Sequence, residues 1–263
     1  MPPLHLHRFG PNGAAPQVLA VHGLTGHGLR WAPTAHALGP VGVLAPDLRG
    51  HGRSPWTPPW SIEAHVADLS AVLDLFPDVR PVLVGHSFGG NLVTHLAHGL
   101  GDRVRALVLV DPALGLDPEF ALQVATAYAE SPHYPDREEA RADKLHGGWA
   151  DVPAARLDAD VDEHLVDLPG GRYGWRVAVP AAVAAWGEMA RPAPLPPAGL
   201  PTTVLRAGRV HPPFTTDAHL ERMADLLGPA LKVRTVDAEH MLTQSHPESI
   251  AAEIAALLTR SGR

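Results

Sequence analysis

A serine between glycines is the first candidate for chemistry in this sequence. The motif GHSFGG occupies residues 85–90, directly after the apolar run 82–84 and before a segment with a helical pattern. A G-x-S-x-G match alone is frequent by chance, but between a strand and a helix it is typical of a sharp turn that presents a nucleophile. Glycines in such a turn let the strand and the helix approach closely. We therefore predict that Ser87 is a nucleophile and that His86 lines its pocket; a plain glycine-rich turn is the alternative.

A late histidine could activate this serine. His240 follows the apolar run 233–236 and precedes a helical pattern, and this position distinguishes it among 17 histidines. From there it can reach the sheet edge where Ser87 is expected, take the serine proton as general base and pass it to the leaving group.

The loop HGLTG, residues 22–26, follows the apolar run 18–21 and could stabilise a developing oxyanion. The expected donors are the backbone amides of Leu24 and of Phe88, the residue after the serine. His22 is predicted to line the substrate pocket, with a structural role in the turn as the alternative.

The rest of the chain supplies the elements that must position these groups. Short apolar runs, each followed by a turn and then a helical pattern, indicate parallel strands covered on both faces. These runs are residues 18–21, 41–45, 82–84, 107–110, 203–205 and 233–236. Helices are predicted at residues 61–76, 91–100, 217–227 and 248–258. With Ser61 as the expected N-cap of the first helix, the alternation predicts an α/β fold.

The alternation stops between residues 114 and 200. This segment shows no convincing strand, reads as helices broken by Pro and Gly, and ends in the proline-rich stretch 192–201. It holds 14 acidic and seven basic residues, so it carries the whole net charge of −7. We predict an inserted helical lid in which Trp149, Trp175 and Trp186 either line the substrate pocket or form the lid core.

The order of these motifs resembles that of the α/β-hydrolase fold superfamily. The resemblance rests on HGLTG (22–26), DLRGHGRS (47–54), GHSFGG (85–90), LVLVDPA (107–113) and the late histidine, and is strongest to esterases, lipases and C–C hydrolases with a helical cap. It implies a mostly parallel, eight-stranded sheet with helices on both faces. The core would comprise residues 1–113 and 201–263, with the cap at 114–200 and an antiparallel edge strand at 4–9.

The acid that should orient His240 departs from the family pattern. In such families it usually follows the seventh strand, but the stretch GRVHPP (208–213) offers His211 there and no carboxylate. Some members carry the acid after the sixth strand, where this chain has Asp111. Asp111 is thus the preferred candidate, Asp217 is the second, and a weakened or missing acid is the third possibility. Glu239 is a poor candidate because a neighbouring residue cannot easily reach the ring of His240.

These residues predict a serine hydrolase of carboxylic esters or lactones that works through an acyl-enzyme on Ser87. The serine excludes dehalogenases and epoxide hydrolases of this fold, which need an aspartate there. A small, mostly neutral and apolar substrate is expected, because an acidic lid should repel anions. The alternatives are a hydrolase-like small-ligand binding protein and a C–C hydrolase, lyase or acyltransferase of the same fold.

Composition excludes several other classes. With no cysteine among 263 residues, disulfides, thiolate metal sites and cysteine nucleophiles are ruled out. The net charge argues against a nucleic-acid partner, and no apolar run reaches 18 residues. The N-terminus lacks a signal-peptide pattern. We expect a cytoplasmic monomer or homodimer that acts on a small molecule without a cofactor or metal, because His95 and His98 lack a third ligand nearby.

Overall fold

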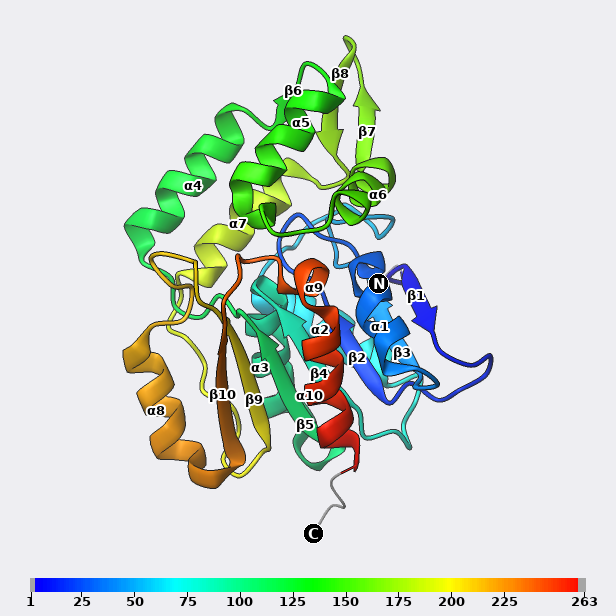
Figure 1. The fold of residues 1–263 in the computed structure, drawn as a ribbon, viewed down its shortest axis with the longest axis vertical. Helices are drawn as coiled ribbons and strands as arrows, with labels where there is room; N and C mark the ends of the chain where they lie inside the picture. Colours follow the sequence, from blue (N-terminus) through cyan, green and yellow to red (C-terminus); the bar gives the residue numbers. More distant parts are fainter. Residues whose placement is uncertain (1–2, 260–263) are drawn as a thin grey trace.

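The computed structural model of the chain describes residues 3–259 and is built around a seven-stranded sheet (Figure 1). The strands lie in the order β1-β3-β2-β4-β5-β9-β10, and only β1 runs antiparallel to its neighbour. Their bounds are β1 (Leu6–Phe9), β2 (Val18–Val21), β3 (Val43–Pro46), β4 (Val82–His86), β5 (Ala106–Val110), β9 (Thr202–Ala207) and β10 (Leu231–Val236).

The mostly parallel sheet and the antiparallel edge strand agree with the prediction, but the strand count does not. The sheet has seven strands rather than eight in the part of the chain that the structure describes. A single strand, β1, precedes β2, and residues 10–17 between them form turns instead of a further strand.

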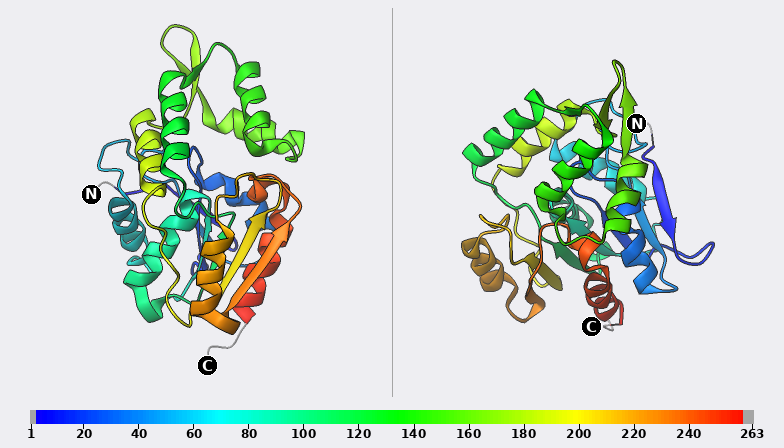
Figure 2. Two further views of the ribbon diagram at one scale, coloured as in Figure 1. Left: turned by 90° about the vertical axis from the view of Figure 1, so that its left-hand side faces the viewer. Right: turned by 45° about the horizontal axis from the view of Figure 1, so that its top comes forward.

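Helices cover both faces of the sheet because alternate strand residues point to opposite sides. In β4, Val82 belongs to one fully buried apolar cluster and Leu83 to another. The cluster with Leu83 includes side chains of α2, α3 and α8, and the cluster with Val82 includes side chains of α1 and α10. The left view of Figure 2 shows α2 and α3 on one side of the strands and α10 on the other.

Four helices of the core, α2, α3, α8 and α10, follow the predicted segments closely, whereas α1 and α9 were not predicted. Their bounds are α1 (Ala32–Leu38), α2 (Ile62–Leu73), α3 (Phe88–Leu100), α8 (Asp217–Leu227), α9 (Leu242–Ser245) and α10 (Pro247–Thr259), with short turns η1 (Gly28–Trp31), η2 (Gly101–Arg103) and η4 (Gly228–Ala230). Ser61 caps α2 as expected, since its hydroxyl accepts the Ala64 amide at 3.3 Å.

The segment between β5 and β9 packs over one end of the sheet (Figure 1). It contains α4 (Pro118–Glu130), β6 (His133–Tyr134), α5 (Arg137–Lys144), η3 (Leu145–Trp149), α6 (Ala154–His164), β7 (Leu165–Leu168), β8 (Arg172–Trp175) and α7 (Val179–Met189). We call this group of elements the cap. None of its helices, nor any other described helix, is long and apolar enough to cross a membrane.

The prediction of no strand in the cap is wrong. β6, β8 and β7 form a small antiparallel sheet. The turn between β7 and β8 contains Gly170 and Gly171, both with positive φ, at 79° and 71°. Adjacent glycines with positive φ are a hairpin signal, but the flanking strands have only four residues each, too few to show a clear apolar alternation.

Candidate active site

The turn that carries Ser87 has strained backbone geometry. The residue lies between β4 and α3 with φ 53° and ψ −121°, a left-handed conformation that is uncommon for a residue with a side chain. A Cβ atom at Gly85 would lie 2.3 Å from the Gly89 carbonyl oxygen, and one at Gly89 would lie 2.3 Å from that of Val21. The Ser87 amide donates to the Val110 carbonyl at 3.0 Å. The glycines of GHSFGG therefore allow the strand and the helix to approach closely, as the motif predicts.

His240 is held by a carboxylate from another strand end. Its Nδ1 donates to Oδ2 of Asp111 at 2.6 Å, and Oδ1 of Asp111 accepts the Ala207 amide at 3.0 Å. Asp111 directly follows β5 and is buried. The alternative acid, Asp217, begins α8, is mostly exposed and pairs with Arg206 instead. The structure thus brings Asp111, and not Asp217, to His240.

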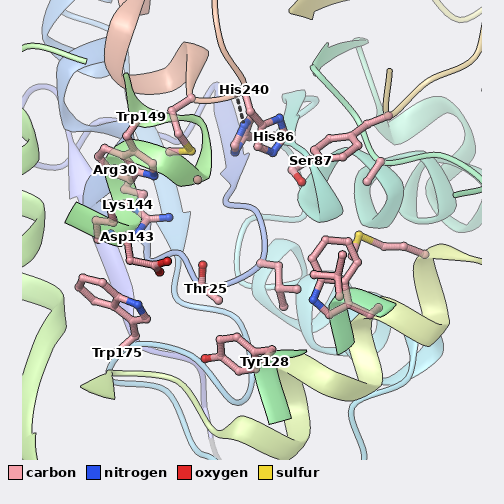
Figure 3. Close-up of a pocket in the computed structure, with 18 of the residues that line it drawn as sticks. Thr25, Arg30, His86, Ser87, Tyr128, Asp143, Lys144, Trp149, Trp175 and His240 are labelled. Carbon is pink, nitrogen blue, oxygen red and sulfur yellow. Dashed lines mark hydrogen bonds between the residues drawn. The ribbon is translucent and has the colours of Figure 1, made fainter. Parts of the chain in front are cut away.

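Ser87 and His240 line the same cavity, and Figure 3 shows the two side chains on one wall with His86 between them. The Ser87 hydroxyl makes no hydrogen bond to His240 among the described residues. Catalytic hydrogen bonds of this kind are often long until substrate binds. The shared cavity places the alcohol, the imidazole and the buried acid in one site.

The His240 ring is packed from two sides. The His86 ring lies against it at 4.5 Å between centroids, and His86 Nε2 donates to the His240 carbonyl at 3.0 Å. The Phe214 ring packs against it in a T-shaped arrangement, with 4.6 Å between the ring centroids. Burial, and to a lesser degree the nearby His240, lower the pKa of His86 well below its ordinary value, so this ring stays neutral. His86 and Phe214 therefore fix the orientation of His240 without adding charge.

The prediction that His22 lines the substrate pocket is wrong. Its ring is buried and both nitrogens bond to backbone: Nε2 accepts the Leu48 amide at 2.9 Å and Nδ1 donates to the Gly23 carbonyl at 2.7 Å. Burial and the neighbouring His51 lower its pKa, so it remains in this neutral form. His22 instead holds the loop 22–26, in which Leu24 does line the cavity.

The expected oxyanion donors remain available. Neither the Leu24 nor the Phe88 amide donates to an acceptor in the turns and loops of residues 3–259. Phe88 is the first residue of α3, whose amide has no acceptor within the helix. A Cβ atom at Gly23 would lie 2.9 Å from Cβ of Ser87, so this loop approaches the nucleophile closely.

The cavity has a volume of about 270 Å³ and lies between the core and the cap, since residues of both line it. One part of its wall is apolar and adjoins the catalytic residues, since the Ala113 amide donates to the Ser87 carbonyl at 3.1 Å and Phe214 packs on His240. This part is formed by Ala113, Leu116, Val124, Trp186, Met189 and Phe214. All three tryptophans predicted for the pocket, Trp149, Trp175 and Trp186, line the cavity.

A second part of the wall is charged, and sequence reasoning missed it. It contains Arg30 from η1 and Lys144 from the end of α5, both almost fully buried. Oδ1 and Oδ2 of Asp160 accept from Nε and Nη2 of Arg30 at 2.7 and 3.0 Å, and Oδ2 also accepts from Lys144 Nζ at 2.5 Å. This network joins the cap to the core across 130 residues. The signal that the sequence offers is that Lys144 is one of only two lysines in the chain.

Most of the acidic residues of the cap lie away from the cavity. Of its acidic residues only Asp143 lines the cavity. The argument from net charge for a neutral substrate therefore loses its basis. Among the other acidic residues of the cap only Asp160 is buried, and its charge is paired with Arg30 and Lys144.

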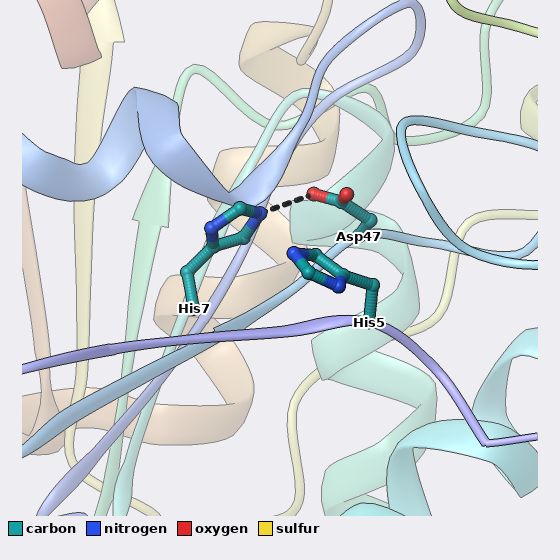
Figure 4. Close-up of side chains that lie close together, drawn as sticks. All are labelled: His5, His7 and Asp47. Carbon is teal, nitrogen blue, oxygen red and sulfur yellow. Dashed lines mark hydrogen bonds and ion pairs between the residues drawn. The ribbon is translucent and has the colours of Figure 1, made fainter.

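One group of three potential metal ligands occurs among the described residues, away from this cavity. His5, His7 and Asp47 lie at the edge strand (Figure 4), with ligand atoms within 4.8 Å of one another. The Asp47 carboxylate already accepts from His7 Nε2 at 2.9 Å and from the Gly28 and Arg53 amides. These hydrogen bonds account for the cluster, because they help to hold β1 against β3.

Comparison with known proteins supports one family. A sequence profile of the Alpha/beta hydrolase family matches residues 18–253. Lipase LipV of Mycobacterium tuberculosis is 49% identical over 251 residues, covering 95% of this chain and 96% of that protein. Two solved structures, at 22% and 21% identity, share the fold. They are E-2-(acetamidomethylene)succinate hydrolase (TM-score 0.77, covering 97% of this chain and 94% of that chain) and a marine microorganism esterase (TM-score 0.76, covering 98% and 100%).

Proposed function

The chain belongs to the alpha/beta hydrolase family, and from that premise we propose that it is a serine carboxylic ester hydrolase whose nucleophile is Ser87. The similarity to a lipase over nearly the whole chain supports an esterase or lipase reaction on a small-molecule substrate. The observation that carries the mechanism is the 2.6 Å bond between His240 and Asp111 at the cavity that Ser87 lines.

In the proposed reaction the Ser87 oxygen attacks the ester carbonyl carbon while Nε2 of His240 takes the hydroxyl proton. The carbonyl oxygen becomes an oxyanion that accepts hydrogen bonds from the Leu24 and Phe88 amides. The carbon–oxygen bond to the alcohol breaks, and His240 gives its proton to the leaving oxygen. An acyl-enzyme on Ser87 remains.

Water completes the cycle by the same groups in reverse. His240 takes a proton from the water, whose oxygen attacks the acyl carbon, and then returns the proton to the Ser87 oxygen as the ester bond to the enzyme breaks. Asp111 holds Nδ1–H of His240 throughout and stabilises the imidazolium that forms in each half-reaction.

The apolar wall near Ser87 favours a small ester or lactone in which hydrocarbon groups flank the reacting carbonyl. Trp186, Met189 and Phe214 would contact that part of the substrate. A hydrolase-like binding protein would be favoured by a missing acid, and the bond between Asp111 and His240 supplies that acid.

The test is hydrolysis of short-chain ethyl esters by the purified protein and by Ser87→Ala. We expect kcat/KM to fall by about 10⁴-fold or more in the variant. Ser70→Ala, a serine on α2 that does not line the cavity, is the matched control and should keep its activity. Equal activity of the wild-type protein and Ser87→Ala would refute the proposal.

A further inference from the structure

We propose that the cavity takes esters that carry a second, free carboxylate, which pairs with Arg30 and Lys144 on the wall opposite Ser87. This inference deepens the proposed function and rests on it. Figure 3 shows Arg30, Lys144, Asp143 and Trp175 grouped on one wall, with the cavity between them and Ser87.

The first argument is the balance of buried charge on this wall. Arg30 and Lys144 are 6% and 7% exposed and share a single buried carboxylate, that of Asp160. The histidines packed against the same group add no positive charge, because burial lowers the pKa of His27 and of His164. Two buried cations therefore have one buried counter-ion, and charges removed from water are stable only when paired.

The second argument is that donors remain available toward the cavity. Nη1 of Arg30 has no acceptor in the described part of the chain, because Asp160 takes only Nε and Nη2. Lys144 Nζ has one carboxylate partner and otherwise faces the rings of Trp149 and Trp175, at 4.3 and 4.1 Å from their centroids. Both residues line the cavity, so a bound carboxylate can receive hydrogen bonds from both.

The protonation of Lys144 agrees with this shortage of counter-charge. Burial lowers its pKa to about 7, with a further contribution from Arg30, and Asp160 only partly offsets these effects. A substrate carboxylate would supply the missing negative charge and favour the protonated amine.

Asp143 carries the opposing charge on the same wall. Its carboxylate is exposed and accepts the Tyr134 hydroxyl at 2.6 Å, so solvent screens it, whereas Arg30 and Lys144 are buried. The buried cations should therefore determine which charge the cavity prefers. A preference set by Asp143 would instead favour a cationic substrate, and the experiment separates the two.

The experiment compares three ethyl esters with acyl chains of similar length that end in a carboxylate, a carboxamide or a trimethylammonium group. They are monoethyl glutarate, ethyl 4-carbamoylbutanoate and ethyl 4-(trimethylammonio)butanoate. We expect kcat/KM for the carboxylate to exceed that for the isosteric amide by about 10-fold or more, with the cation slowest. A ratio near one, or a preference for the cation, would overturn the inference.

The variant Lys144→Met tests whether Lys144 binds the free carboxylate of the substrate. The ratio of carboxylate to amide kcat/KM should fall by about 10-fold or more. Lys232→Met changes the only other lysine, which pairs with Glu253 on the far edge of the sheet, and should leave the ratio unchanged. An unchanged ratio in Lys144→Met would contradict the proposal.

Binding without turnover keeps this test separate from the proposed function. Glutarate should raise the melting temperature of Ser87→Ala but not of Ser87→Ala/Lys144→Met. If glutarate binds in this way and no ester is hydrolysed, the proposed function fails and the anion site stands. If esters are hydrolysed and glutarate has no effect on Ser87→Ala, the anion site fails and the hydrolase stands.

Discussion

Replacing Asp111 with asparagine should nearly abolish turnover without unfolding the protein. Oδ1 of Asp111 accepts the Ala207 amide, so the oxygen of an asparagine must stay on that side. Its NH₂ group then faces Nδ1 of His240, 2.6 Å from the present carboxylate oxygen. Two donors cannot face each other, so His240 must move its proton to Nε2, where it can no longer accept the proton of Ser87.

The expected loss is about 10⁴-fold in kcat, equivalent to about 5.5 kcal/mol of transition-state stabilisation. Steady-state hydrolysis of an ethyl ester measures it, and circular dichroism with a melting curve checks that Asp111→Asn is folded. Asp217→Asn is the matched control, because that carboxylate pairs with Arg206 on the surface. The reasoning is refuted if Asp111→Asn keeps more than about a tenth of wild-type kcat, or if Asp217→Asn loses as much.

Three further predictions concern the framework of the site. Gly89→Ala places a methyl group 2.3 Å from the Val21 carbonyl oxygen, so the turn must shift; we expect a lower melting temperature and at least a tenfold loss of kcat, and wild-type values for both would contradict this. Asp160→Asn leaves Arg30 and Lys144 without their buried counter-ion. The free energy of unfolding, measured in urea, should fall by about 3–5 kcal/mol, and a fall below about 1 kcal/mol would contradict a stabilising role for this network. Burial lowers the pKa of His51 to about 4, so the unfolded chain binds a proton at this residue before the folded one does as the pH falls below about 6.5. The free energy of unfolding should therefore decrease between pH 6.5 and 4, by about 1.4 kcal/mol per pH unit for this group, and urea titrations that show no decrease would rule this out.

Local sequence patterns predicted the parts of the molecule that depend on local physics. The strand before Ser87, the turn and the helix after it follow from an apolar run and from glycines that a tight crossing requires. Ser61 begins its helix as a serine N-cap should. The family resemblance then made Asp111 the preferred acid but left Asp217 and a missing acid open, and only the structure brings Asp111 to His240.

The small sheet of the cap and the charged wall of the cavity were not predictable in the same way. β7 and β8 are short and pair only with each other and with β6, so their sequence carries little apolar alternation. Arg30 and Asp160 are 130 positions apart, and no local pattern reports a contact at that separation. His22 lies in the expected loop, but only the packing around it decides that both its nitrogens bond to backbone and not to a substrate.

The central claim is that Ser87 is a nucleophile activated by His240. The most direct measurement is reaction of the native protein with a fluorophosphonate, followed by intact mass and peptide mapping. We predict rapid addition of one phosphonyl group per chain, on Ser87, with no labelling of Ser87→Ala and slow labelling of Asp111→Asn. A native protein that hydrolyses esters yet stays unlabelled, or carries the label on another residue, would contradict the account.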